Sequence, residues 1–135
     1  MKRVFLDANI LFTAAHNPHG KAAFVVELGL HGHWRLFTST YAAEEARRNL
    51  AIKFPRQLDA LQTILEALAL ISAHKMHNCP AGLAVKDQPI YQAAVESRAT
   101  HLLTGDIKDF GALMNRPEDT NGIIIQTVAD FLASL

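Results

Sequence analysis

The sequence predicts a three-layer α/β/α sandwich in which helices cover both faces of a central, mostly parallel sheet. Short apolar runs alternate with longer amphipathic ones along the chain, and no repeat or low-complexity linker interrupts them. The length of 135 residues fits a single domain over 1–135, large enough to bury a core without disulfides. In such folds ligands bind beyond the carboxyl ends of the strands, so functional residues are expected there.

Short apolar runs mark the expected strands. Residues 4–6 are three consecutive apolar residues bounded by charge, which is typical of a buried parallel strand. The remaining strands are expected at 35–38, 101–104 and 123–125, with a weaker candidate at 69–73.

Helical spacing of apolar residues marks the longer segments. A turn at 16–20 precedes the first of these helices, Thr40 is the expected N-cap of the second, and Pro55 closes that helix. Asp87 opens a later helix with Pro89 in its first turn, after an irregular connection at 74–85. The other helices are expected at 21–30, 40–53, 58–68 and 127–135.

Acidic residues follow the predicted strands. Asp7 comes directly after the first strand, and Asp106 follows the strand at 101–104 after Gly105, which makes a tight turn. Because carboxyl ends of parallel strands share one rim of the sheet, these carboxylates are expected to converge. The acidic residues expected at this rim are Asp7, Glu44 or Glu45, Asp87, Asp106 and Asp109.

Clustered carboxylates repel one another unless a cation neutralises them. Only Lys86 and Lys108 lie next to the acids in sequence, so a hard divalent cation, Mg²⁺ or Mn²⁺, is the expected neutraliser. Such a site suits metal-dependent phosphodiester hydrolysis. Taken singly, each aspartate also suits a helix N-cap or helix start, and the glutamates suit a solvated helix face.

The motifs around these acids resemble those of the PIN domain family. The resemblance rests on Phe5-Leu6-Asp7-Ala8-Asn9-Ile10-Leu11, on Thr38-Ser39-Thr40 with Glu45, and on the run from Lys86 to Phe110 that contains Leu102-Leu103-Thr104-Gly105-Asp106. It implies a parallel-sheet fold and a Mg²⁺- or Mn²⁺-dependent ribonuclease site, as in VapC-like toxins of bacterial toxin-antitoxin pairs. It also implies an RNA substrate, an antitoxin protein as partner, and a homodimer.

The resemblance also assigns roles to individual residues. The second acid follows a serine at a fixed distance in the family: counting from Ser39 selects Glu45, which is our choice, and counting from Thr38 selects Glu44. Asn9 and Thr104 match polar positions that support the site by hydrogen bonding. The catalytic set is then Asp7, Glu45, Asp87 and Asp106, and the metal ligands are Asp7, Asp87, Asp106 and the auxiliary Asp109.

A basic concentration follows Glu45, with Arg47, Arg48 and Lys53 as expected contacts to RNA phosphates. The same residues equally suit an ordinary solvated helix face or a surface that binds a partner helix. Nothing in the sequence separates these three interpretations.

Composition excludes several other functions. Thirteen basic residues balance thirteen acidic ones, which argues against a disordered tail or a generally basic nucleic-acid coat. No membrane or targeting segment is expected, and the lone Cys79 favours a reducing cytoplasm. We expect Cys79 to be a partly buried thiol rather than a nucleophile. Surface or capping roles are expected for the histidine pairs, rather than zinc binding, at His16/His19, His31/His33 and His74/His77.

Two other function classes compete with the nuclease. A haloacid dehalogenase type phosphatase needs a second acid two residues after its first aspartate, where this chain has Asn9. A catalytically inactive PIN-fold module that binds RNA or a partner protein is the other alternative. Against it, clustered carboxylates without a metal would cost stability.

Overall fold

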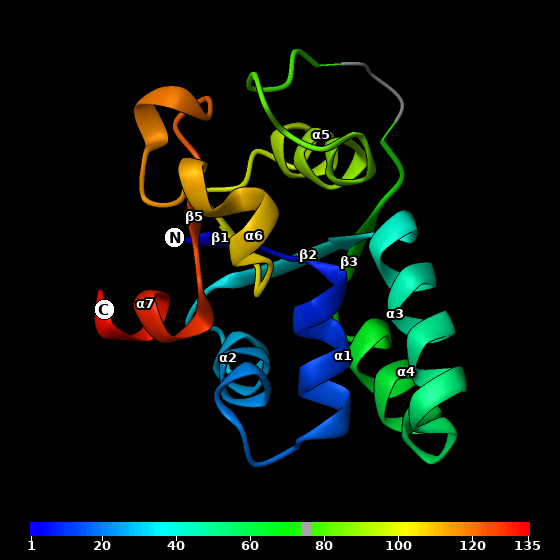
Figure 1. Cartoon of the computed structure of the whole chain (residues 1–135). Coiled ribbons are helices and arrows are strands. Elements are labelled where there is room, and N and C mark those ends of the chain that lie inside the picture. Colours follow the sequence, from blue (N-terminus) through cyan, green and yellow to red (C-terminus); the bar gives the residue numbers. More distant parts are fainter. Residues whose placement is uncertain (74–76) are drawn as a thin grey trace.

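The central sheet is entirely parallel, whereas the sequence predicts a mostly parallel one. The structure, a computed structural model, describes residues 1–73 and 77–135. The strand order is β3-β2-β1-β4-β5, and every strand pairs in parallel with its neighbours (Figure 1). The strands are β1 (Arg3–Leu6), β2 (Arg35–Ser39), β3 (Ala69–Ile71), β4 (His101–Leu103) and β5 (Ile124–Gln126).

The strand order reverses at β1. The chain adds β2 and β3 on one side of β1 and then returns to add β4 and β5 on the other side. In open parallel sheets such a reversal leaves a crevice at the carboxyl ends of the two central strands. Here those strands are β1 and β4, with Leu6 opposite Leu103.

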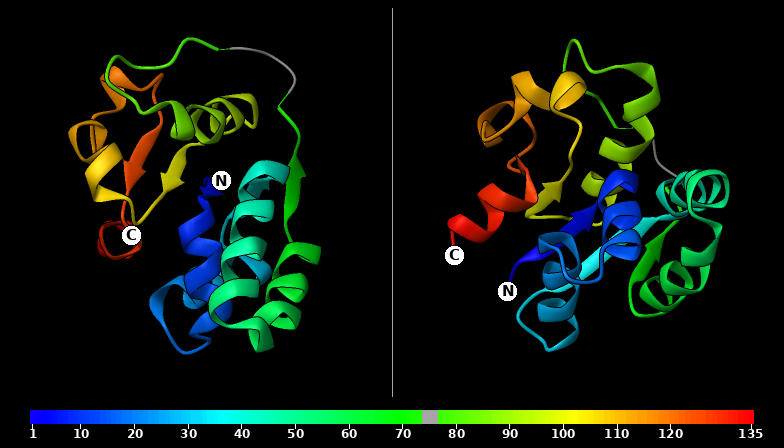
Figure 2. Two further views of the ribbon diagram at one scale, coloured as in Figure 1. Left: turned by 45° about the vertical axis from the view of Figure 1, so that its right-hand side comes forward. Right: turned by 60° about the horizontal axis from the view of Figure 1, so that its bottom comes forward.

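Helices cover both faces of the sheet. In Figures 1 and 2, helices α1 to α4 lie on one face and α5 lies on the other. This division follows from right-handed crossovers, because the return from β3 to β4 runs in the opposite direction across the sheet. The α-helices are α1 (Ala8–His16), α2 (Lys21–Leu30), α3 (Thr40–Lys53), α4 (Leu58–Glu66), α5 (Gln88–Glu96), α6 (Ile107–Phe110) and α7 (Val128–Ala133).

The start of α3 corrects one sequence prediction. Ser39, not Thr40, is the N-cap: its hydroxyl accepts a hydrogen bond from the Ala42 N–H at 3.0 Å. Thr40 is the first helical residue. Both residues have hydroxyl side chains suited to capping, so the choice depends on β2, which continues to Ser39.

Other element bounds differ from prediction by a few residues. Helix α4 ends at Glu66 rather than at 68, since the Ala67 and Leu68 N–H groups bond three residues back and tighten the last turn. The weak strand is β3, shorter than the expected 69–73. The last strand is β5, one residue later than expected, and Thr127 caps α7. Of the irregular connection, 74–76 lie outside the described residues.

The core explains why the short strands are apolar. Val4, Phe5 and Leu6 of β1 are fully buried, as are Leu102 and Leu103 of β4. Both strands lie in the middle of the sheet, where helices exclude water from both faces. Among the described residues, no helix is both long enough and apolar enough to cross a membrane.

Candidate metal centre

The acidic residues meet at the crevice between β1 and β4. The pairing of these strands continues one residue beyond their ends, because the Asp7 N–H donates to the Leu103 carbonyl at 3.0 Å. The Thr104 N–H likewise donates to the Gln126 carbonyl at 3.0 Å. These bonds hold Asp7 beside Thr104 at the carboxyl edge of the sheet.

Protein donors hold both carboxylate oxygens of Asp7. Its Oδ1 accepts from the Ala8 N–H at 2.6 Å, which makes Asp7 the N-cap of α1. Its Oδ2 accepts from the Thr104 hydroxyl at 2.8 Å and from the Asn9 amide at 3.4 Å. Burial raises the pKa of Asp7, the Thr104 and Ala8 hydrogen bonds lower it, and the charges of Glu45 and Asp106 raise it further.

Asn9 and Thr104 connect the loop after β4 to Asp7. The Asn9 side-chain oxygen accepts from the Gly105 N–H at 2.7 Å, and its amide nitrogen approaches the Thr104 hydroxyl at 3.3 Å. The Thr104 hydroxyl also accepts from the Asp106 N–H at 3.1 Å. The two residues predicted to support the site therefore fix the position of both Asp7 and Asp106.

Asp87, Asp106 and Asp109 form a compact group of carboxylates, here called the acidic triad. One oxygen from each residue lies within 4.8 Å of the other two, and it is the one such group of His, Cys, Asp or Glu in residues 1–73 and 77–135. Asp106 also caps the short helix α6, because its Oδ1 accepts from the Asp109 N–H at 3.0 Å.

Asp87 is the member of the triad that the protein leaves least satisfied. The side chain makes no capping hydrogen bond at the start of α5, although Asp87 occupies the N-cap position. The residue is only 7% exposed, and its buried Oδ2 has no hydrogen-bond partner among the described residues. The capping interpretation therefore fails for Asp87, whereas Asp7 and Asp106 both cap helices.

Lys86 provides the cation nearest to the triad. Its Nζ lies 2.9 Å from Asp109 Oδ2 and 3.7 Å from Asp106 Oδ2, while its side chain remains 65% exposed. Its backbone carbonyl accepts from the Tyr41 hydroxyl at 3.2 Å, which ties this segment to α3. The hydrogen bond to Asp109 is the main reason that the Lys86 pKa rises to about 12.

Two carboxyl groups of the triad have pKa values that are shifted in opposite directions. Burial raises the pKa of Asp87 to about 7; Lys86 opposes this shift, whereas the charge of Asp106 and both the hydrogen bond and the charge of Asp109 add to it. The pKa of Asp109 is lowered, chiefly by its hydrogen bond with Lys86. A neutral Asp87 beside an ionised Asp109 is thus the arrangement that this environment favours without a divalent cation.

The two candidate glutamates face different surroundings. Glu44 forms an ion pair with Arg47 on the same helix, and its side chain is 47% exposed. Glu45 is half-buried and close enough to Asp7 to raise its pKa. Neighbouring positions on a helix point about 100° apart, and of the two glutamates only Glu45 lines the hollow that Asn9 also lines. This geometry favours our choice of Glu45, whose catalytic role stays a prediction.

The triad is suited to a hard divalent cation. One carboxylate oxygen from each of the three residues lies within 4.8 Å of the others, so small side-chain movements would bring them to the separation of at most about 4.2 Å that two oxygens have when they share one Mg²⁺ with bonds of about 2.1 Å. All of the donors are carboxylate oxygens, which Mg²⁺ and Mn²⁺ prefer. The unpartnered Asp87 oxygen adds a buried acceptor. Asp7 is outside this group, so its predicted role as a metal ligand is not reproduced by the triad geometry and stays a prediction.

The predicted RNA contacts occupy two sides of α3. Lys53 lines a hollow together with Glu45, whereas Arg47 pairs with Glu44, and Arg48 is exposed. The histidines at 16, 19, 31 and 33 are all exposed, and Cys79 is partly buried as expected. His74 lies outside the described residues.

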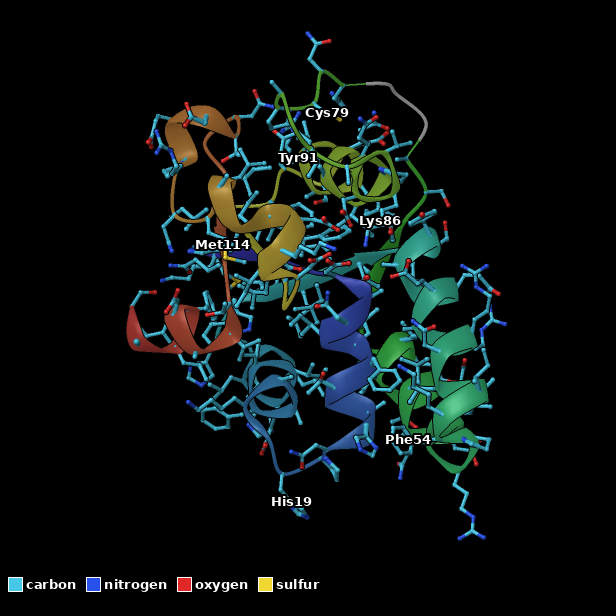
Figure 3. All side chains as sticks on the ribbon, in the orientation of Figure 1. His19, Phe54, Cys79, Lys86, Tyr91 and Met114 are labelled. Atoms are coloured by element: carbon cyan, nitrogen blue, oxygen red, sulfur yellow. The ribbon has the colours of Figure 1, made fainter. Side chains whose placement is uncertain are left out.

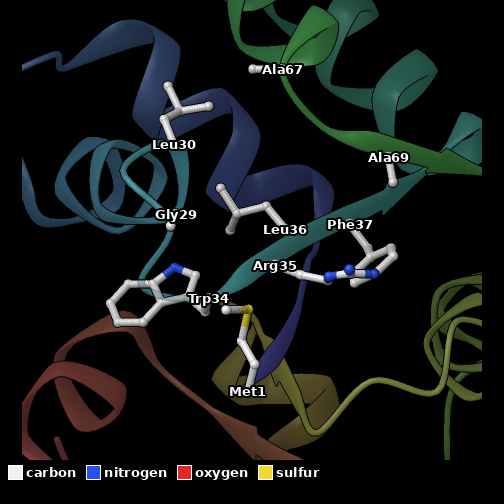
Figure 4. A pocket seen from close by; sticks show the side chains of 10 residues that line it. Met1, Gly29, Leu30, Trp34, Arg35, Leu36, Phe37, Ala67 and Ala69 are labelled. Atoms are coloured by element: carbon white, nitrogen blue, oxygen red, sulfur yellow. The ribbon is translucent and has the colours of Figure 1, made fainter.

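A larger hollow lies away from the acids. Its volume is about 420 Å³, and Figure 4 shows Met1, Trp34 and Leu36 around it. It lies near the starts of β1, β2 and β3, at the amino edge of the sheet, and no acidic side chain lines it. Apart from Arg35 its lining is apolar and offers no metal-binding carboxylate, so we place the candidate metal centre at the carboxyl edge.

The sequence also matches a known family. The model of the PIN domain family covers residues 3–108. The chain belongs to the PIN domain family. The matched span contains Asp7, Glu45, Asp87 and Asp106, while Asp109 lies one residue beyond it. This membership sets aside the haloacid dehalogenase alternative.

Solved structures share the PIN fold with this chain. VapBC2 from Rickettsia felis, bound to a DNA fragment from its promoter, is 16% identical with a TM-score of 0.65, covering 93% of this chain and 98% of that one. DNA-bound VapBC from Salmonella typhimurium is 18% identical with a TM-score of 0.66, covering 95% and 99%. VapBC-1 from nontypeable Haemophilus influenzae is 14% identical with a TM-score of 0.60, covering 94% and 98%. A comparison with curated proteins found no match.

Two features of the site were missed by sequence reasoning. Lys86 was noted only as a nearby cation, although it bridges two acids of the triad. The hollow beside Glu45 also includes Phe12 and Asn49. Helical spacing from Glu45 to Asn49 was the available signal for the second of these.

Proposed function

We propose that this PIN domain is a Mg²⁺- or Mn²⁺-dependent ribonuclease that hydrolyses RNA phosphodiester bonds. The main support is Asp87, whose buried Oδ2 has no hydrogen-bond partner among the described residues and whose carboxylate is grouped with two further carboxylates. A protein that used these acids only for structure would be expected to pair that oxygen.

The residues of the chain have separate tasks in this proposal. Asp87, Asp106 and Asp109 hold the metal, with Asp7 as a further acid beside them, and Asn9 and Thr104 keep Asp7 and Asp106 in place. The bound metal supplies charge that lowers the pKa of water and stabilises the leaving oxygen. Glu45 lies on the α3 side of the crevice and completes the catalytic set of Asp7, Glu45, Asp87 and Asp106.

The biological setting is a further part of the proposal. The solved structures with this fold are VapBC complexes, so we expect a toxin that binds an antitoxin protein and forms a homodimer in the cytoplasm. Light scattering of the purified chain, alone and co-expressed with a candidate antitoxin protein, tests both associations. A monomer in both samples would contradict them.

Cleavage of single-stranded RNA tests the activity itself. We expect cleavage with Mn²⁺, none with chelator, and a loss of at least about a hundredfold in Asp7→Asn, since changes even in supporting groups of metal sites cost 10- to 100-fold. Calorimetric titration with Mn²⁺ is the parallel measurement, with Asp87→Asn expected to weaken binding at least as much. Glu44→Gln is the matched control, because Glu44 pairs with Arg47 outside the crevice.

The outcomes separate the two functions under comparison. Cleavage that survives both chelator and Asp7→Asn would contradict the metal site. Complete inactivity with Mn²⁺ on varied RNAs would favour the non-catalytic binding module.

A further inference from the structure

The hollow next to Glu45 is the feature that the proposed chemistry leaves unused. It has a volume of about 190 Å³ and lies between α1 and α3, which pack against each other along their lengths (Figure 2). Asn9 and Glu45 line it as well as belonging to the proposed site. These two residues place the hollow next to the proposed site. Its lining residues are Asn9, Phe12, Thr13, Glu45, Asn49 and Lys53.

Helical periodicity on both walls produces this surface. Glu45, Asn49 and Lys53 follow one another every four residues and so share one face of α3. On α1, Asn9 and Phe12 are three residues apart, which is about 4.5 Å along the helix axis. The side chains that line the hollow therefore change over a short distance, from the acid Glu45 near the crevice to the Phe12 ring and the Lys53 ammonium farther along the two helices.

An aromatic cluster with a cation surrounds Phe12, and of this cluster Phe12 and Lys53 line the hollow. The Lys53 ammonium lies 5.7 Å from the centre of the Phe12 ring. Phe54 packs against Phe12 at 5.9 Å, and its ring stacks on His16 at 3.8 Å. Phe54 is 38% exposed, and in Figure 3 it lies at the opposite end of α1 from Lys86.

The aromatic ring and the lysine suit one nucleotide of a single-stranded nucleic acid, its base and its phosphate. Aromatic rings stack on bases of single-stranded RNA, while a neighbouring lysine pairs with phosphate. The exposed Asn49 amide offers both a donor and an acceptor to a base edge. The hollow's volume of about 190 Å³ is below the roughly 300 Å³ at which pockets for drug-sized ligands begin, so we assign it no more than a single base.

We infer that the hollow between α1 and α3 is a subsite for one nucleobase of single-stranded RNA, next to the phosphodiester bond that is cut. The inference rests on the proposed ribonuclease function and extends it. Phe12 provides the stacking face, Lys53 neutralises the adjoining phosphate, and Asn49 contacts the base edge. The subsite makes cleavage depend on a base beside the scissile bond, with stacking rather than hydrogen bonding as the main attraction.

Fluorescence anisotropy with labelled oligoadenylate and oligouridylate tests the subsite. The full chain carries Asp7→Asn to suppress cleavage, and an abasic nucleotide replaces each position of the probe in turn. At one position, loss of the base is expected to weaken binding about fivefold or more, the low end for base stacking. Phe12→Leu, which keeps an apolar side chain in the core, is expected to weaken binding similarly and to abolish that position's sensitivity.

Matched variants control for stability and charge. Phe24→Leu alters an aromatic ring of α2 that is 48% exposed, and Lys21→Gln removes an exposed lysine at the start of α2. Both are expected to bind like the parent, whereas Lys53→Gln weakens binding and flattens its salt dependence. Melting temperatures establish that each variant is folded.

Two different results would overturn the subsite. One is an equal response of parent and Phe12→Leu to base removal at every position; the other is no binding of either oligonucleotide. A surface that instead receives an antitoxin side chain would give the first result. If the unaltered chain cuts RNA with Mn²⁺ but shows no base dependence, only the subsite fails. If binding depends on the base but nothing is cut, only the ribonuclease proposal fails.

Discussion

The two halves of the acidic crevice are stabilised in opposite ways. Asp7 is held by hydrogen bonds from Ala8, Thr104 and Asn9. Asp87 has an unpartnered buried oxygen, and its triad neighbours depend on an exposed lysine for charge balance. The fold therefore satisfies the Asp7 carboxylate with its own donors and leaves one oxygen of Asp87 without a donor. In the proposed function a divalent cation would supply the missing positive charge at Asp87.

Removal of Asp7 is expected to have the largest effect on stability. Asp7→Ala removes the N-cap of α1, worth about 1 kcal/mol, and leaves the buried Thr104 hydroxyl without its acceptor, worth about 1–3 kcal/mol. Urea unfolding in chelator measures the loss. Asp87→Asn is the matched change in the other half, and we expect the metal-free protein to become no less stable at pH 8. Equal destabilisation by both variants would contradict the comparison.

The pH dependence of stability is the next test. The pKa of Asp87 is 3.8 ordinarily and about 7 in the folded chain, so between these values the folded state holds a proton that the unfolded state has released. The stability of the metal-free protein is therefore expected to fall as the pH rises from about 4 to about 7, with a slope of at most about one proton from this group. Thermal unfolding in chelator across this range measures the slope.

Asp87→Asn is expected to reduce this slope without removing it, because Asp7 also has a raised pKa. The pKa of Asp109 is shifted in the opposite direction, so this group does not contribute to the slope. Its lowered pKa contributes stability that is lost only below its ordinary value of 3.8, outside this window. An unchanged slope in Asp87→Asn would show that another group titrates.

The smallest expected effect concerns Lys86. Its ammonium and a divalent cation compete for the same carboxylates, so Lys86→Met is expected to raise Mn²⁺ affinity a few-fold, a modest change because the side chain is largely exposed. Titration with Mn²⁺ at low salt measures the change. Lys108→Met removes the other lysine beside the triad and is expected to leave the affinity nearly unchanged. Weaker metal binding in Lys86→Met would mean that the lysine organises the triad for the metal.

Particular elements show how far the sequence predicts this molecule. The parallel sheet and the positions of these acids follow from short apolar runs, one followed directly by Asp7 and another followed by Asp106 after Thr104 and Gly105. Such runs are recognisable because buried strands need apolar residues wherever they lie in the fold. The N-cap of α3 was wrong by one residue, because Ser39 and Thr40 have the same local chemistry and only the length of β2 decides between them. The choice between Glu44 and Glu45 is similar: both suit the helix, and only the crevice distinguishes them.

The sequence by itself determined the order of the strands and helices, the apolar core and the acids at the carboxyl ends, because these depend on periodicity and on side-chain chemistry near each residue. The tertiary structure alone decided that Asp87 caps nothing, that Lys86 spans two acids contributed by a distant segment, and that α1 and α3 enclose a hollow beside Glu45. Those features depend on how segments far apart in the chain are placed against one another, which local periodicity and side-chain chemistry do not determine.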